Sequence, residues 1–146
     1  MGSAPKPVLQ HAELTEKIIG AFYCVYNDLG PGFLESVYKR SMAIALADLG
    51  LKIEVEHPVP VSFRGQIVGD FRADITVEDR VLLELKAVKH IDSSTEGQIL
   101  HYLRATRFEV GLLMNFGPKA EFPAIYCGKQ KQEKSAESVK SAVGIY

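Results

Sequence analysis

Apolar residues recur along the chain at two different spacings, and the change of spacing separates helices from strands. Over residues 14–29 they return every three or four positions, as on one face of a helix, and the Gly-Pro-Gly at 30–32 ends that stretch. A second stretch of the same kind covers about 34–49 and ends at Gly50. The pattern therefore predicts two consecutive helices.

Beyond residue 50 the spacing changes to two. Odd-numbered apolar residues over 59–63, 67–77 and 81–87, separated by turns at 64–66 and 78–80, predict a meander of antiparallel strands. Because the even positions are mostly polar, we expect one face of this meander to pack under helices. Residues 52–56 are predicted to lead into it as a short edge strand.

The next helix is predicted to begin at Ser93 or Thr95, because each stands three residues before a Glu or Gln in capping-box spacing. It should end near Arg107. The apolar run 110–114 is typical of a strand buried on both faces, and 124–127 is predicted to form one more strand. The elements follow the order α-α-β-β-β-α-β-β.

Composition and charge limit which kinds of protein this chain can be. The 146 residues include 17 Lys and Arg and 18 Asp and Glu, for a net charge of -1, so any nucleic-acid site must be local. We expect one domain over 8–128, with terminal extensions at 1–7 and 129–146. No apolar run approaches the ~18 residues of a membrane span, and the two cysteines lack paired spacing. These features predict a cytoplasmic protein with no membrane segment.

One group of charged residues in the meander suggests chemistry. If three residues form the turn at 78–80, Val77 pairs with Val81, and the same register sets Asp74 opposite Glu84. Two carboxylates so placed repel each other and need a cation. Lys86 lies two residues after Glu84 on the same strand face. The sequence therefore predicts a cluster of two acids and one lysine.

This cluster has two interpretations. Carboxylate oxygens suit Mg²⁺ or Mn²⁺, which serve phosphodiester hydrolysis by neutralising phosphoryl charge while a lysine orients the attacking water or stabilises the transition state. In the alternative, Lys86 merely bridges Asp74 and Glu84 as a surface ion cluster with little net effect. Spacing alone leaves both open.

Several motifs resemble one known family. Asp74 followed by Glu84-Leu85-Lys86, within this order of elements, resembles the PD-(D/E)XK nuclease superfamily. The segment 32–38 (GFLESVY) is similar to the G-x-x-E-x-x-Y signature of the GxxExxY proteins within that superfamily, and 71–74, 96–103 and 111–117 continue the match in order. Ala73 stands where the superfamily name has Pro, a residue that ligates nothing.

The resemblance implies an α/β fold with a restriction-endonuclease-like core, in which helices flank a mixed central sheet. It also implies a metal site formed by Asp74, Glu84 and the carbonyl of Leu85, with Glu35 assisting from the second helix. The alternative for Glu35 is an i,i+4 ion pair with Lys39.

Two further residues enter the site through the resemblance. Gln98 and Tyr102 are similar to the Q-x-x-x-Y helix motif of some superfamily nucleases, where an amide and a phenol contact a phosphate or the water; otherwise they cap a helix face. Tyr38 is expected to pack in the core with its hydroxyl satisfied. Asn115 is expected to hold a loop through side-chain bonds to the backbone.

These features give two hypotheses of function. The first is a Mg²⁺- or Mn²⁺-dependent nuclease that hydrolyses phosphodiester bonds of DNA or RNA. The second is a non-catalytic module on the same fold that binds nucleic acid or protein. A homodimer or a protein partner is compatible with either.

Overall fold

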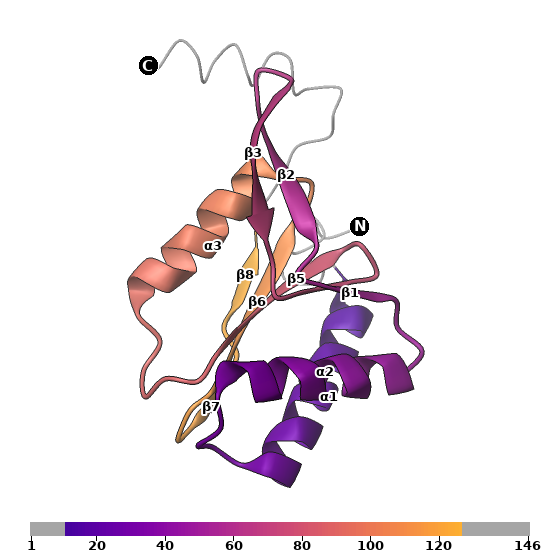
Figure 1. Ribbon diagram of the computed structural model, residues 1–146, viewed down its shortest axis with the longest axis vertical. Coiled ribbons are helices and arrows are strands. Elements are labelled where there is room, and N and C mark those ends of the chain that lie inside the picture. The colour runs from indigo at the N-terminus through magenta and orange to yellow at the C-terminus, as the bar shows by residue number, and fades with distance from the viewer. Residues whose placement is uncertain (1–10, 127–146) are drawn as a thin grey trace, which may run out of the picture.

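A computed structural model of the chain describes residues 11–126 (Figure 1). Two helices come first, followed by strands, a third helix and more strands. No helix in this part of the chain is long and apolar enough to cross a membrane. The elements are α1 (Ala12–Leu29), α2 (Glu35–Asp48), β1 (Ile53–Val55), β2 (Pro58–Phe63), β3 (Gln66–Arg72), β4 (Ile75–Val77), β5 (Val81–Lys86), α3 (Ser93–Ala105), β6 (Val110–Phe116), β7 (Ala120–Glu121) and β8 (Ala124–Tyr126).

The central sheet has six strands in the order β1-β4-β5-β6-β7, and β8 also pairs with β6. β4 and β5 are antiparallel with Val77 opposite Val81, which confirms the predicted register. β5 and β6 are parallel. The sheet is therefore mixed, as the resemblance implied.

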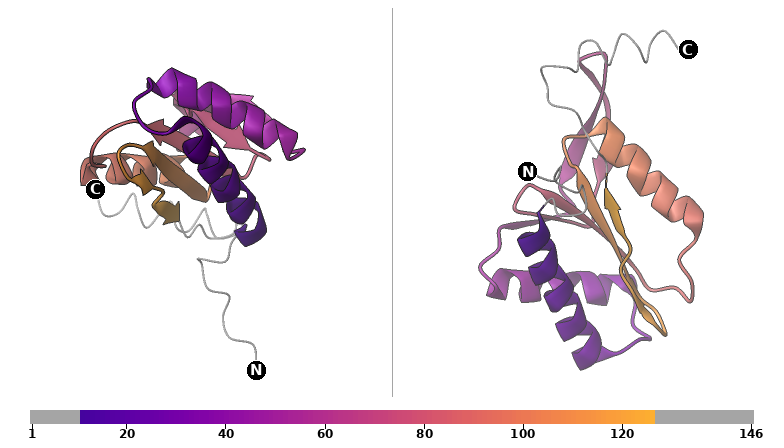
Figure 2. Two further views of the ribbon diagram at one scale, coloured as in Figure 1. Left: turned by 90° about the horizontal axis from the view of Figure 1, so that it is seen from below. Right: turned by 180° about the vertical axis from the view of Figure 1, so that it is seen from behind.

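Helices cover both faces of this sheet. α1 and α2 lie on one face and α3 lies on the other (Figure 2). Along β5, Leu83 and Leu85 join the core under α1 and α2, whereas Leu82 joins the core under α3. The prediction of one packed face for β4 and β5 is thus wrong, because α3 is the crossover between two parallel strands and must lie against the sheet.

The predicted meander is also interrupted. The single strand expected over 67–77 is two strands, β3 and β4, separated at Ala73 and Asp74. β3 pairs only with β2, in a two-stranded sheet that projects from the body (Figure 1). Its odd-numbered residues Phe63 and Ile67 are exposed. Alternation in the sequence is therefore not matched by burial here, because none of the helices between residues 11 and 126 covers this end of the hairpin.

The turn between α1 and α2 is fixed by Tyr38. This side chain is fully buried, and its hydroxyl donates to the carbonyl of Gly30 at 2.6 Å and accepts from the N–H of Phe33 at 3.2 Å. Its ring stacks on Phe116 with the centroids 4.3 Å apart. Within the turn, Gly32 has a φ of 112°, a conformation that favours glycine. The predicted structural role of Tyr38 is confirmed.

The beginning of α3 differs from prediction in its cap. The N-cap is Asp92, whose side chain accepts from the N–H of Ser94 at 3.1 Å, and neither Ser93 nor Thr95 takes that position. Asp is as good an N-cap as Ser or Thr. Of the two predicted caps, Ser93 lies one residue and Thr95 three residues after the observed one.

Asn115 holds the loop that follows β5. It is fully buried, its Oδ1 accepts from the N–H of Val88 at 3.0 Å, and its Nδ2 donates to the carbonyl of Val88 at 2.8 Å and to Glu121 at 3.3 Å. The prediction that Asn115 holds a loop through side-chain bonds to the backbone is confirmed.

We expect Asn115→Ala to lower the free energy of unfolding by about 3 kcal/mol, because it leaves a backbone donor and acceptor without partners. Urea denaturation at pH 7 measures this change. The control is Asn27→Ala at an exposed position of α1, which should change stability little. A loss no greater than that of the control would contradict the role of Asn115.

Candidate active site

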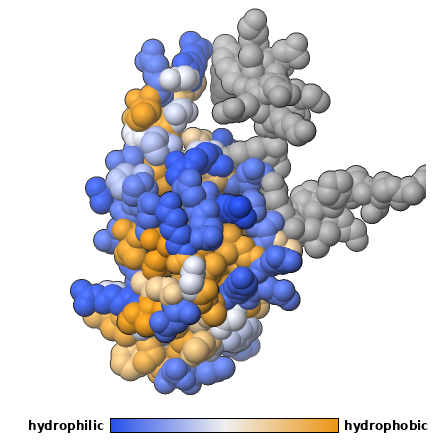
Figure 3. Space-filling model, turned by 90° about the vertical axis from the view of Figure 1, so that its right-hand side faces the viewer, coloured by the Kyte–Doolittle hydropathy of each residue, from blue (hydrophilic) through white to orange (hydrophobic). Residues whose placement is uncertain are grey.

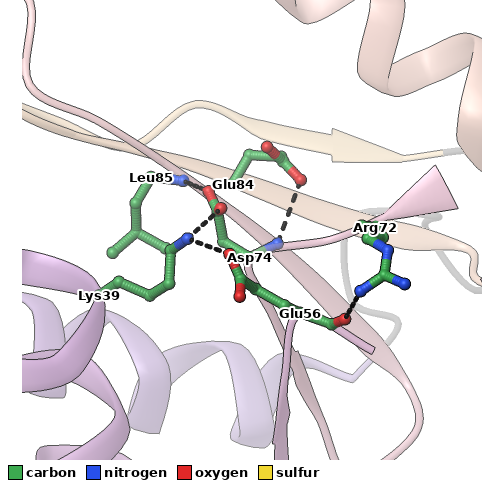
Figure 4. Close-up of polar contacts among 6 residues, drawn as sticks. All are labelled: Lys39, Glu56, Arg72, Asp74, Glu84 and Leu85. Atoms are coloured by element: carbon green, nitrogen blue, oxygen red, sulfur yellow. Dashed lines mark hydrogen bonds and ion pairs between the residues drawn. The ribbon is translucent and has the colours of Figure 1, made fainter. Parts of the chain in front are cut away.

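The site lies where β4 and β5 separate. Their pairing ends at Ile75 and Leu83, and Asp74 is the next residue outward. There the Asp74 side chain replaces the missing backbone partner, since its Oδ2 accepts from the N–H of Leu85 at 2.7 Å (Figure 4). This bond fixes the orientation of the carboxylate beside β5.

Glu84 lies next to Asp74, as the register predicted. Its Oε1 is 3.4 Å from the backbone nitrogen of Asp74, which donates to it. Burial, and then the negative charge of Asp74, raise the pKa of Glu84 from 4.5 to about 8, and the charge of Lys86 offsets only part of that effect. Glu84 is therefore largely buried next to a second carboxylate, and both conditions favour its protonated form.

Lys39 is a member of the cluster that sequence reasoning missed. Its Nζ lies 3.1 Å from Oδ1 of Asp74 and 3.0 Å from Oε1 of Glu56 (Figure 4). Burial lowers the pKa of Lys39, but the hydrogen bonds to Glu56 and Asp74 outweigh it and raise the pKa above 10.5. The i,i+4 spacing suggested Glu35 as its partner, and only the packing of α2 over the sheet brings it to Asp74.

Lys86 is half-buried on β5, two residues after Glu84. No ion pair joins it to any other residue within 11–126. The interpretation in which Lys86 bridges the two acids is therefore not observed, because Lys39 takes the position beside Asp74. The Lys86 ammonium is left beside the cluster without a fixed partner among the described residues.

Three other predicted site residues are not brought into this cluster. Glu35 is exposed at the first residue of α2, one turn before Lys39, and nowhere within 11–126 do three or more His, Cys, Asp or Glu side chains gather around one point. Gln98 is exposed on α3. Tyr102, also on α3, stacks on Phe71 of β3 with the ring centroids 3.9 Å apart.

Comparison with known protein families shows which family this chain belongs to. A model of the PD-(D/E)XK nuclease superfamily matches residues 12–125, which is most of the chain. The chain belongs to the PD-(D/E)XK nuclease superfamily. No curated protein matches the chain.

Two solved structures are similar to this PD-(D/E)XK protein. One, described as the crystal structure of SSO0001, has 17% identity and a TM-score of 0.51 over 94% of this chain and 70% of that chain, which shows a shared fold. The other is an alkaline exonuclease (LHK-Exo) from Laribacter hongkongensis, with 11% identity and a TM-score of 0.38 over 75% of this chain and 61% of that chain.

PD-(D/E)XK nucleases generally use divalent metal ions, and the donor set here fits such an ion. Asp74 and Glu84 lie next to each other, and burial, followed by the charge of Asp74, raises the pKa of Glu84 although the charge of Lys86 acts to lower it. Mg²⁺ commonly binds through one or two carboxylates and keeps several waters, so a third acidic side chain is not required.

The raised pKa of Glu84 predicts how stability depends on pH. Between pH 4.5 and about 8 the folded protein holds a proton that the unfolded chain has released. This contribution to the free energy of unfolding is therefore complete below pH 4.5 and is lost as the pH rises through 8. We expect Glu84→Gln, which cannot ionise, to lack a decline on the order of 2–4 kcal/mol.

Urea denaturation at pH 5 and pH 8 in the presence of EDTA measures this difference. The matched control is Glu16→Gln at an exposed position of α1, which should keep the wild-type decline. An equal decline in Glu84→Gln would show that Glu84 ionises normally in the folded protein.

Proposed function

We propose that this protein is a metal-dependent nuclease that hydrolyses phosphodiester bonds of nucleic acids. The observation that carries the proposal is the contact between Asp74 and Glu84 at the end of β4. Lys86 lies close enough to act on the charge of Glu84 and forms no ion pair with another residue of 11–126. Membership in a nuclease superfamily supports it. The G-x-x-E-x-x-Y segment at 32–38 supports placement among the GxxExxY proteins.

In the proposed site, Asp74, Glu84 and the Leu85 carbonyl would hold Mg²⁺ or Mn²⁺. A bound ion would neutralise charge on the phosphoryl group and lower the pKa of a coordinated water. Glu35 would contact the ion only through a water molecule or after a movement of its exposed side chain. Lys39 keeps Asp74 in orientation by its ion pair at 3.1 Å.

Lys86 is proposed to serve the reaction and not the metal. Its ammonium can orient the attacking water or stabilise the negative charge that develops on the phosphoryl oxygens. Gln98 and Tyr102 are proposed to contact the nucleic acid from α3. The stacking of Tyr102 on Phe71 supports a position at the base of the hairpin, where a bound strand would lie.

A non-catalytic binding module on the same fold is the second candidate. The ion pairs of Lys39 with Asp74 and Glu56 favour it, because they satisfy part of the acidic charge without a metal. The net charge of -1 also favours it. In either case the unpaired spacing of the cysteines supports a location in the cytoplasm.

Metal binding distinguishes the two candidates. We expect millimolar Mg²⁺ or Mn²⁺ to raise the melting temperature of the wild type by roughly 5–10 °C at 100 times Kd, because the ion binds the folded state selectively. Asp74→Asn should lose this shift. Asp70→Asn, at an exposed position of β3, should retain it. No shift in the wild type, or an equal shift in Asp74→Asn, would favour the binding module.

Replacement of Lys86 separates metal binding from chemistry. We expect Lys86→Met to bind Mg²⁺ as tightly as the wild type or more tightly, because a nearby positive charge is removed. Cleavage of a labelled oligonucleotide should fall by roughly 10²–10³-fold as transition-state stabilisation is lost. Lys89→Met, at an exposed lysine beyond β5, is the control. Cleavage at the wild-type rate by Lys86→Met would contradict its assigned role.

A further inference from the structure

The hairpin of β2 and β3 carries hydrophobic side chains at the end that projects into solvent. Phe63 is 57% exposed, Ile67 is 71% exposed and Val68 is 63% exposed. In the space-filling view the hairpin stands apart from the body and shows hydrophobic surface close to its end (Figure 3). Such a concentration of apolar side chains in water is typical of a binding surface.

The other end of the hairpin is firmly attached to the domain. Val59 of β2 is only 1% exposed, and Phe71 of β3 stacks on Tyr102 of α3 with an angle of 13° between the rings. At the tip, Arg64 and Gly65 have φ values of 51° and 76°, which makes a tight two-residue turn. The hairpin is therefore a short rigid arm with an anchored base.

The charge near the tip indicates what kind of molecule this arm meets. Between residues 61 and 69 the only charged residue is Arg64, whose guanidinium lies 5.0 Å from the centroid of the Phe63 ring. Apolar side chains with one cation and no acid suit the bases and phosphates of a nucleic acid. Proteins that insert apolar side chains between base steps combine them with Arg in this way.

A continuous stretch of chain joins the tip of the arm to the candidate active site. β3 leads directly into Asp74, and Ile67 precedes Asp74 by seven residues. At about 3.3 Å per residue that distance is roughly 23 Å, or about seven base pairs of a duplex. A duplex with one phosphate at Asp74 is thus long enough to reach the tip.

We propose that the end of the β2–β3 hairpin is a wedge that enters between two base pairs of a double-stranded nucleic acid. Phe63 would face one of these base pairs, and Ile67, on the opposite face of the hairpin, would face the other. The inference rests on the proposed function for the position of the duplex, because the reacting phosphate would lie at Asp74 and Glu84. It makes the duplex the substrate class, and the tip the part of the protein that opens or bends it.

The test is the fluorescence of duplexes that carry 2-aminopurine at successive positions, titrated with protein in EDTA so that no cleavage occurs. We expect the wild type to increase the fluorescence at one or two adjacent positions, because unstacked 2-aminopurine is brighter. Phe63→Ser/Ile67→Ser should abolish this increase and raise Kd for the duplex roughly 10- to 100-fold. Val68→Ser alone should give a smaller loss in the same direction.

The matched control is Ile44→Ser, which removes an apolar side chain that is 65% exposed on α2, away from the hairpin. It should behave as the wild type. A wild type that brightens no position, or a double variant that keeps the signal and the affinity, would overturn the wedge. The wedge would also be overturned if the double variant lost self-association or binding to anionic vesicles while its binding to the duplex was unchanged.

Mg²⁺-dependent cleavage of a single-stranded oligonucleotide of the same sequence tests the proposed function separately. Cleavage by the wild type together with unchanged duplex binding by the double variant would refute the wedge and leave the nuclease standing. Insertion by the wild type, lost in the double variant, without metal-dependent cleavage of either substrate would support the wedge and refute the nuclease.

Discussion

The bond from the Leu85 N–H to the Asp74 carboxylate is the interaction on which the site depends. It forms where β4 stops pairing with β5, so a side chain continues the ladder that the backbone has left. Because that bond holds Asp74 beside β5, Glu84 must lie against a second negative charge. Burial of Glu84, and then this neighbouring charge, raise its pKa to about 8.

Positive charge around Asp74 comes from two elements with different roles. Lys39 reaches over from α2 and pairs with Asp74 and Glu56, whereas Lys86 stays on β5 without an ion pair among the described residues. A lysine that is already paired orients a carboxylate, and a lysine that is not paired is available to a substrate. Lys86 therefore supports the proposed nuclease, whereas the ion pairs of Lys39 support the non-catalytic binding module.

The same strand break that creates the site also frees the hairpin. β3 ends just before Asp74 and pairs with β2 in a separate two-stranded sheet, and no other strand within residues 11–126 pairs with either of them. The stack of Phe71 on Tyr102 is the contact that keeps this arm aligned with the domain. Tyr102, which the sequence suggested as a site residue, thus has an observed structural role at the base of the arm.

Local periodicity and turn spacing determined much of this protein. They predicted the helices, the buried strand β6, the pairing of Val77 with Val81, and hence the approach of Asp74 to Glu84, because each depends on residues close in sequence. Tertiary packing alone decided the rest. Alternation cannot show whether a strand is covered, so it did not reveal the exposure of Ile67. Helical spacing cannot show what a helix faces, so it offered Lys39 only as an alternative partner for Glu35, whereas the packing of α2 brings Lys39 to Asp74.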